Sequence, residues 1–137
     1  MERLKETVSC VVVPKAREYG VTILLEPLKR GESNLINTVE EGFSFVSSIS
    51  SPQFLLMADI YHMNLNGEDL SSLRASLGVV HHIHIAGVER SLEDTLRNPY
   101  ILQALSLLRS CGYDETISFE TCDGDIAAAL EALKGVI

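Results

Sequence analysis

The chain has 137 residues, 46% of them hydrophobic, so it can fold as a globular domain with a buried core. Its net charge of −8 argues against nucleic acid and anionic membranes as partners, because phosphate binding needs clustered lysine and arginine. No apolar run approaches the roughly 20 residues of a membrane helix, and the charged start lacks the apolar core of a signal peptide. The three cysteines lack C-x-x-C spacing, which indicates neither a disulfide framework nor a thiolate zinc site, so we expect a reducing cytoplasm.

Helical and strand-like segments alternate along the chain. Each strand candidate is a short apolar run bounded by turn residues, as expected for a strand covered on both faces. In chain order we expect a helix over 1–19, a strand over 21–26, a helix from 37 to about 50, a strand over 54–59, a helix over 69–77, a strand over 79–86, a helix over 99–111, a strand over 116–120 and a helix over 125–136. This α(βα)₄ order predicts an α/β fold with four parallel strands in one domain, residues 1–137.

Several boundaries carry specific signals. Pro14 cannot continue a helix interior without a kink, so we expect a kink or a new helix start there, and Gly20 ends the first helix. Asn37 and Glu40 have the spacing of a capping box at the start of the second helix. The remaining polar segments are predicted to be loops, including the one around Gly67 and the charged stretch 87–98.

Every predicted strand ends in an acidic group or an imidazole, namely Glu26, Asp59, His84 and Glu120. Because side chains alternate along a strand, each of these groups shares a face with the residues two and four positions earlier, as Val80 and His82 do with His84. The carboxyl ends of parallel strands meet at one rim, where α/β proteins bind ligands. Three carboxylates and one imidazole suit a hard divalent cation, so the sequence predicts a site for Mn²⁺, Mg²⁺ or Co²⁺.

Each of these residues also has a plainer interpretation. An acidic residue at a strand end can cap the next helix, and His84 alone could be a satisfied core histidine. His81 points away from His82 and His84, so we expect His81 to be structural or exposed and His82 to pack inward. Arg90 lies in a loop at the same rim and is the charged loop residue of greatest interest.

Four motifs in order resemble the xylose isomerase-like TIM barrels, and most closely the ketose 3-epimerases of the D-tagatose and D-psicose type. They read EPLKRGES at 26–33, DIYHM at 59–63, HIHIAGVER at 82–90 and GYDETISFE at 112–120. The resemblance covers nearly the whole chain but only the second half of a family member. It therefore implies half of a (β/α)₈ barrel, a fold that takes about 250 residues when complete.

The resemblance implies a divalent metal, Mn²⁺ first and Mg²⁺ or Co²⁺ as alternatives, bound by Glu26, Asp59, His84 and Glu120. It also implies that Glu26 and Glu120 are the acid–base pair of a sugar isomerase or epimerase. These two would move a proton at the carbon beside a ketose carbonyl, through a metal-stabilised enediolate. The substrate implied is a small ketose.

Three further residues, Glu32, His62 and Arg90, match family positions that bind substrate oxygens. Two features depart from the family pattern and bear on the choice of sugar. Lys29 stands where the family usually has asparagine, and the segment after Arg90 lacks the usual proline- and glycine-rich stretch.

Other functions fit the same motifs. Inosose dehydratase and hydroxypyruvate isomerase share the superfamily and the metal, whereas a nuclease of the endonuclease IV type would use more histidines and a less acidic surface. A half-barrel alone would leave two strand edges unpaired, so we expect either a homo-oligomer or an N-terminal half-barrel to cover them. A truncated, non-catalytic half-barrel that acts as an oligomeric scaffold is the remaining alternative.

Overall fold

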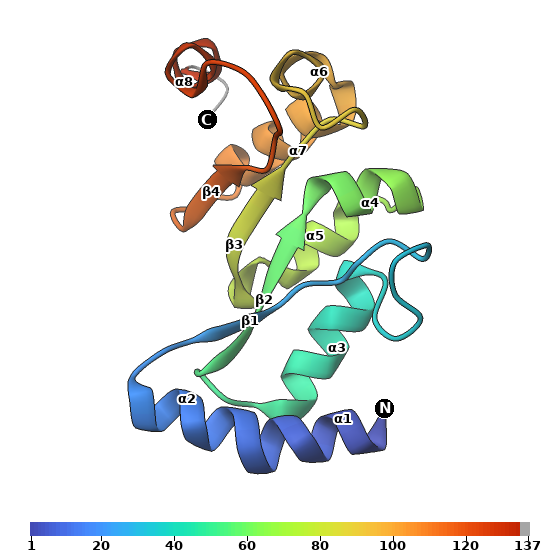
Figure 1. Ribbon diagram of the computed structural model, residues 1–137, viewed down its shortest axis with the longest axis vertical. Helices are drawn as coiled ribbons and strands as arrows, with labels where there is room; N and C mark the ends of the chain where they lie inside the picture. Colours follow the sequence, from blue (N-terminus) through green and yellow to red (C-terminus); the bar gives the residue numbers. More distant parts are fainter. Residues whose placement is uncertain (135–137) are drawn as a thin grey trace.

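The computed structural model describes residues 1–134, which form one parallel four-stranded sheet with helices packed against it (Figure 1). The strands lie in sequence order and are β1 (Ile23–Leu25), β2 (Phe54–Asp59), β3 (Val80–Ile85) and β4 (Thr116–Phe119). The helical segments are α1 (Glu2–Thr7), η1 (Val8–Val12), α2 (Val13–Tyr19), α3 (Val39–Ile49), α4 (Ile60–Asn66), α5 (Leu70–Ser76), η2 (Leu77–Val79), α6 (Leu92–Arg97), α7 (Pro99–Ser110) and α8 (Ile126–Leu133). The predicted α/β fold with four parallel strands is confirmed.

The hydrogen-bonding pattern of the N-terminal helical segment changes next to Pro14, and α2 starts at Val13 with Pro14 in its first turn, which agrees with the predicted helix start. The backbone remains helical across Pro14, and the five residues of η1 just before α2 form a wider, π-helical turn. Such a turn accommodates the absence of the backbone hydrogen bond that proline cannot donate. Gly20 ends α2 in the left-handed conformation with φ of 64°, as predicted.

The capping box of α3 lies one residue later than predicted. Thr38 Oγ1 accepts a hydrogen bond from the Glu41 amide at 3.1 Å, and the Glu41 carboxylate accepts one from the Thr38 amide at 3.2 Å. Asn37 is buried instead, and its side chain donates to the carbonyls of Leu28 and Ser33 at 2.7 and 2.8 Å. These contacts fix the loop after β1, and Thr38 is the residue that caps the helix.

Two short helices, α4 and α6, occupy segments that were predicted to be loops. α4 follows β2 directly, because Asp59 Oδ1 accepts from the Tyr61 amide at 2.8 Å. Ser91 Oγ caps α6 by accepting from the Asp94 amide at 3.1 Å. The last predicted helix is present as α8, but its predicted end at Val136 lies outside the described residues. Within residues 1–134, no helix has the length and apolar character needed to cross a membrane.

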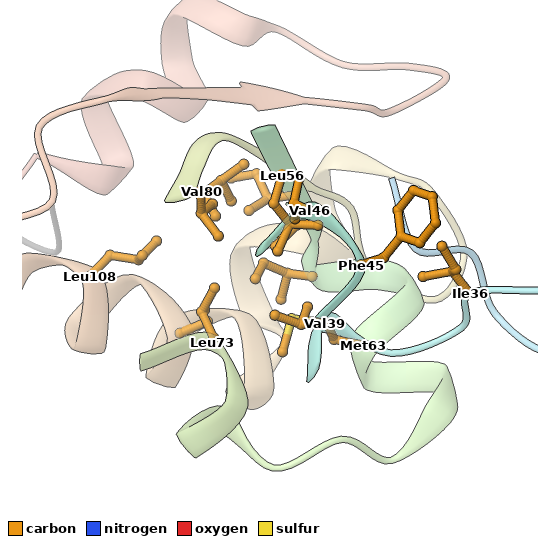
Figure 2. Close-up of a cluster of buried hydrophobic side chains, with 14 of the residues drawn as sticks. Ile36, Val39, Phe45, Val46, Leu56, Met63, Leu73, Val80 and Leu108 are labelled. Atoms are coloured by element: carbon orange, nitrogen blue, oxygen red, sulfur yellow. The ribbon is translucent and has the colours of Figure 1, made fainter. Parts of the chain in front are cut away.

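One face of the sheet holds the hydrophobic core beneath α3, α5 and α7 (Figures 1 and 2). Leu56, Ile83 and Leu105 are fully buried there. Val80 was predicted to share a face with His82 and His84, and this prediction is wrong. The β2–β3 register shifts so that Val80 pairs with Leu56. Val80 therefore joins the core cluster. The register shift also leaves His84 paired with Asp59 at the carboxyl end, which is the placement that the metal-site prediction needs.

Candidate metal centre

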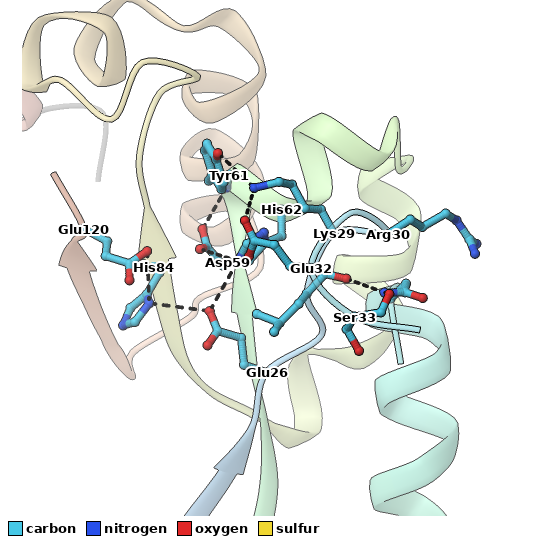
Figure 3. Close-up of polar contacts among 12 residues, drawn as sticks. Glu26, Lys29, Arg30, Glu32, Ser33, Asp59, Tyr61, His62, His84 and Glu120 are labelled. Carbon is cyan, nitrogen blue, oxygen red and sulfur yellow. Dashed lines mark hydrogen bonds and ion pairs between the residues drawn. The ribbon is translucent and has the colours of Figure 1, made fainter. Parts of the chain in front are cut away.

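The four predicted ligands converge at the carboxyl-end rim of the sheet (Figure 3). Glu26 follows β1, Asp59 ends β2, His84 lies near the end of β3 and Glu120 follows β4. Although β1 and β4 are the two outer strands, the Glu26 and Glu120 carboxylates lie 3.9 and 4.0 Å from the same atom, His84 Nδ1. The curl of the sheet thus brings side chains from its opposite edges to one point.

Two overlapping groups of side chains have the composition of a cation site. In the first group the ligand atoms of Glu26, Asp59 and His62 all lie within 4.8 Å of one another, and in the second the same holds for Asp59, His84 and Glu120. All four predicted ligands are included. Asp59 belongs to both groups, so its buried carboxylate is the part of the site that they share. His62, expected on the substrate side, also lies against Asp59, with 3.6 Å between Nε2 and Oδ2.

Several buried polar atoms at this rim have no hydrogen-bond partner among residues 1–134. They are Asp59 Oδ2, His62 Nδ1 and His84 Nδ1. Asp59 Oδ1 caps α4, whereas Oδ2 has no hydrogen-bond partner in the described part of the chain and is available to a cation. A buried polar group without a partner costs about 1–3 kcal/mol, which a bound cation would offset. The donor set and its unpartnered atoms therefore fit a divalent cation.

Burial controls the charge of this site. It raises the pKa of the Asp59 carboxyl to about 7, and the neighbouring Glu120 and Glu26 carboxylates add to the increase. Burial also raises the pKa of Glu26, with Glu120 adding to the increase and His84 opposing it. Burial lowers the pKa of His62, which favours its neutral form. A cation would reverse the effect on the carboxyl groups, because its charge favours their ionised forms.

The predicted substrate-binding residues line the same rim. Glu32 Oε2 lies 3.8 Å from His62 Nε2, and Arg90 donates to Glu120 Oε2 at 2.7 Å. Lys29 forms an ion pair with Glu32, and this contact lowers the pKa of Glu32. All three predicted residues, Glu32, His62 and Arg90, thus lie beside the candidate ligands.

Tyr61 is the rim residue that sequence reasoning missed. Its hydroxyl accepts a hydrogen bond from Lys29 Nζ at 3.2 Å, and the Arg90 guanidinium lies 4.2 Å from the centre of its ring. Tyr61 therefore links the loop after β1 to the loop after β3. The motif DIYHM contains this residue, but its position between two cations depends on contacts between distant segments.

The three neighbouring histidines of β3 have different surroundings. His82 lies between the Thr116 and Ser118 hydroxyls at 2.6 and 2.8 Å, and its ring packs edge-on against His84. His81 instead faces Glu115, with 3.1 Å between Nδ1 and Oε1. Of the three, His84 is the one that joins the carboxylates of the rim.

Comparison with known proteins gives the chain a family. The family model of the xylose isomerase-like TIM barrel matches residues 2–136. An L-ribulose 3-epimerase of Mesorhizobium japonicum is 32% identical over 116 residues, which cover 84% of this chain and 39% of that protein. A D-psicose 3-epimerase of Ruminiclostridium cellulolyticum is 30% identical, covering 80% of this chain and 37% of that protein.

Solved structures agree with the sequence comparison. An L-ribulose 3-epimerase structure superposes with a TM-score of 0.77 at 28% identity, covering 93% of this chain and 43% of that one. A D-psicose 3-epimerase with D-tagatose from Clostridium cellulolyticum H10 gives a TM-score of 0.77 at 27% identity, covering 96% of this chain and 46% of that one. The chain thus spans about two fifths of the length of the curated relatives it matches. It belongs to the xylose isomerase-like TIM-barrel family.

Proposed function

We propose that this chain carries the metal centre and both proton carriers of a metal-dependent ketose epimerase. The observation that carries the proposal is the approach of Glu26 and Glu120, from opposite edges of the sheet, to the same nitrogen of His84. The similarity to relatives named L-ribulose 3-epimerase and D-psicose 3-epimerase supports a ketose as substrate.

Glu26, Asp59, His84 and Glu120 would hold the metal, with Mn²⁺ preferred and Mg²⁺ or Co²⁺ as alternatives. Support comes from the oxygen-rich donor set and from the unpartnered Asp59 Oδ2 and His84 Nδ1 among the described residues. When bound, a divalent cation would polarise the ketose carbonyl and make the hydrogen on the adjacent carbon more acidic.

Glu26 and Glu120 are suited to act on opposite faces of that carbon. The ionised glutamate removes the proton of that carbon. The other glutamate, in its protonated form, returns a proton from the opposite side, which inverts the configuration. Arg90 holds the Glu120 carboxylate in place through a hydrogen bond of 2.7 Å.

Glu32, His62 and Arg90 would bind the oxygens of the sugar. The ionised Glu32 carboxylate can accept from a hydroxyl, and neutral His62 can donate or accept a hydrogen bond. Lys29 and Tyr61 hold Glu32 and Arg90 in position through the contacts described above.

Proton exchange with solvent tests the proposal. In deuterated water with Mn²⁺, the chain is expected to introduce deuterium beside the carbonyl of at least one ketose in a panel that includes L-ribulose, D-psicose and D-tagatose. Glu120→Gln should abolish the exchange, whereas Glu115→Gln, the same substitution at the opposite end of β4, should leave it unchanged. No exchange with any ketose would contradict the epimerase proposal.

Lys29 motivates a second candidate within the family. Its ammonium group bridges Glu32 and Tyr61 at the position where asparagine is usual, which alters the substrate side of the rim. An inosose or hydroxypyruvate added to the same panel would distinguish inosose dehydration or hydroxypyruvate isomerisation from epimerisation. Cation binding without turnover of any compound would favour the non-catalytic scaffold.

A further inference from the structure

Both outer edges of the sheet lack a neighbouring strand within residues 1–134. Among the residues that the structure describes, β1 pairs only with β2, and β4 pairs only with β3. Figure 1 shows the N-terminal helix and α8 at opposite ends of the molecule, beyond β1 and β4 respectively. An open strand edge exposes backbone donors and acceptors that can pair with another chain.

The side of the molecule next to β1 is apolar and grooved. A groove of about 340 Å³ lies between η1, α2 and the start of β1. Its walls include Val11, Tyr19, Val21 and Ile23, which are between 39% and 71% exposed. We call these four residues the β1-side surface. Clustered apolar side chains with this exposure are typical of an interface.

The side next to β4 carries a second apolar surface. Ile126 and Leu130 of α8 are 44% and 50% exposed. Ile117 and Phe119 of β4 pack against the core but are only partly buried at this edge of the sheet. We call these four residues the β4-side surface. The strands of a parallel sheet are normally covered on both faces, so this partial exposure also indicates a missing neighbour.

The two sides differ in charge. Residues 1–21 carry four basic and three acidic side chains, whereas residues 113–134 carry one basic and six acidic side chains. Two copies that join unlike sides would bring an acidic segment against a weakly basic one. Two copies that join at their β4 sides would bring acidic segments together, which is unfavourable.

We propose that a second copy of this chain is the missing neighbour, with the β1-side surface of each copy against the β4-side surface of the other. Joining unlike edges keeps all strands parallel, and a two-fold axis repeats the contact at a second seam. The result is a closed ring of eight parallel strands, which has no open edge. This proposal concerns assembly and does not depend on the proposed epimerase activity.

The mass in solution tests the proposal. Light scattering during gel filtration at micromolar concentration is expected to give twice the 15.1 kDa of the single chain. Tyr19→Glu and Leu130→Glu, one on each surface, should each shift the mass toward the single chain. Leu35→Glu is the matched control, because Leu35 is 55% exposed and belongs to neither surface, and it should remain dimeric.

Mixing the two variants tests which edges meet. In a mixed dimer one seam carries both substitutions and the other is entirely wild type, so the mixture should recover dimers that neither variant forms alone. Circular dichroism confirms that each variant is folded, and Tyr19→Ser with Leu130→Ser provide a milder pair if the glutamates prevent folding.

Three results would overturn the proposal. One is a monomeric wild-type chain, as expected if another polypeptide covers these edges. Another is a dimer that Leu130→Glu does not weaken, which would mean that like edges meet. The third is equal dissociation by Leu35→Glu, which would indicate a general effect of added charge.

Discussion

The helix-covered face of the sheet and its carboxyl-end rim differ in how they treat polar groups, although their residues are neighbours along the same strands. On the helix-covered face, Leu56, Ala58 and Ile83 are completely buried and belong to the hydrophobic core cluster. At the carboxyl-end rim, Asp59 and His84 are next to those residues in sequence, yet each retains a buried polar atom without a hydrogen-bond partner among the described residues. The helix-covered face therefore supplies stability, whereas the rim loses stability by keeping ligand atoms available.

The largest expected change in stability comes from a substitution in the core of the helix-covered face. Leu56→Ala should lower the free energy of unfolding by about 2–5 kcal/mol, because it removes a fully buried side chain and leaves a cavity. Chemical denaturation measures this change. Leu65→Ala on α4 is the matched control, since Leu65 is 43% exposed, and it should change stability by less than about 0.5 kcal/mol. Equal effects from the two variants would contradict the division between the faces.

The rim should respond in the opposite direction. Asp59→Asn keeps an oxygen to cap α4 but removes a buried charge, so it should stabilise the cation-free protein at pH 8 by roughly 1–3 kcal/mol. The pKa of Asp59 is about 7 in the folded protein, above its ordinary value of 3.8. The folded state therefore binds this proton more tightly, and the contribution of Asp59 to stability is lost as the pH rises from about 4 to 7.

Thermal or chemical unfolding at pH 5 and at pH 8 measures this prediction. Wild type should lose stability relative to Asp59→Asn between these two values, and added Mn²⁺ should restore wild type more than the variant, because a ligand stabilises the state that binds it. Identical pH dependence of the two proteins would mean that burial does not affect this carboxyl group.

Asn37 connects the two regions and should have an intermediate effect. Its amide satisfies the carbonyls of Leu28 and Ser33 and so fixes the loop that carries Lys29 and Glu32. Asn37→Ala is expected to cost about 1–3 kcal/mol, because it leaves two acceptors unpaired in a partly buried loop. Isothermal titration with Mn²⁺ should show a smaller change for this variant than for Glu120→Gln. Unchanged stability would show that the loop holds its shape without Asn37.

Much of the fold follows from local sequence. The four apolar runs predict the strands, and the polar residue that ends each run correctly predicts the convergence at one rim. The two short helices were missed because they begin at polar caps, Asp59 and Ser91, within segments that lack a clear apolar period. The face of Val80 depends on a register shift between neighbouring strands, and the place of Tyr61 depends on two distant loops. Neither is encoded in the spacing of nearby residues.

The smallest expected effect lies on the helix-covered side, at the corrected start of α3. Thr38→Ala removes the side-chain acceptor for the Glu41 amide and should cost about 1 kcal/mol. Thr38→Ser keeps the hydroxyl and should recover most of that loss. Because Thr38 is not among the rim residues, denaturation should detect the change while Mn²⁺ affinity remains that of wild type. A parallel loss of Mn²⁺ affinity would mean that the helix-covered side and the rim are energetically coupled through the start of α3, and the separation between them would then fail at this position.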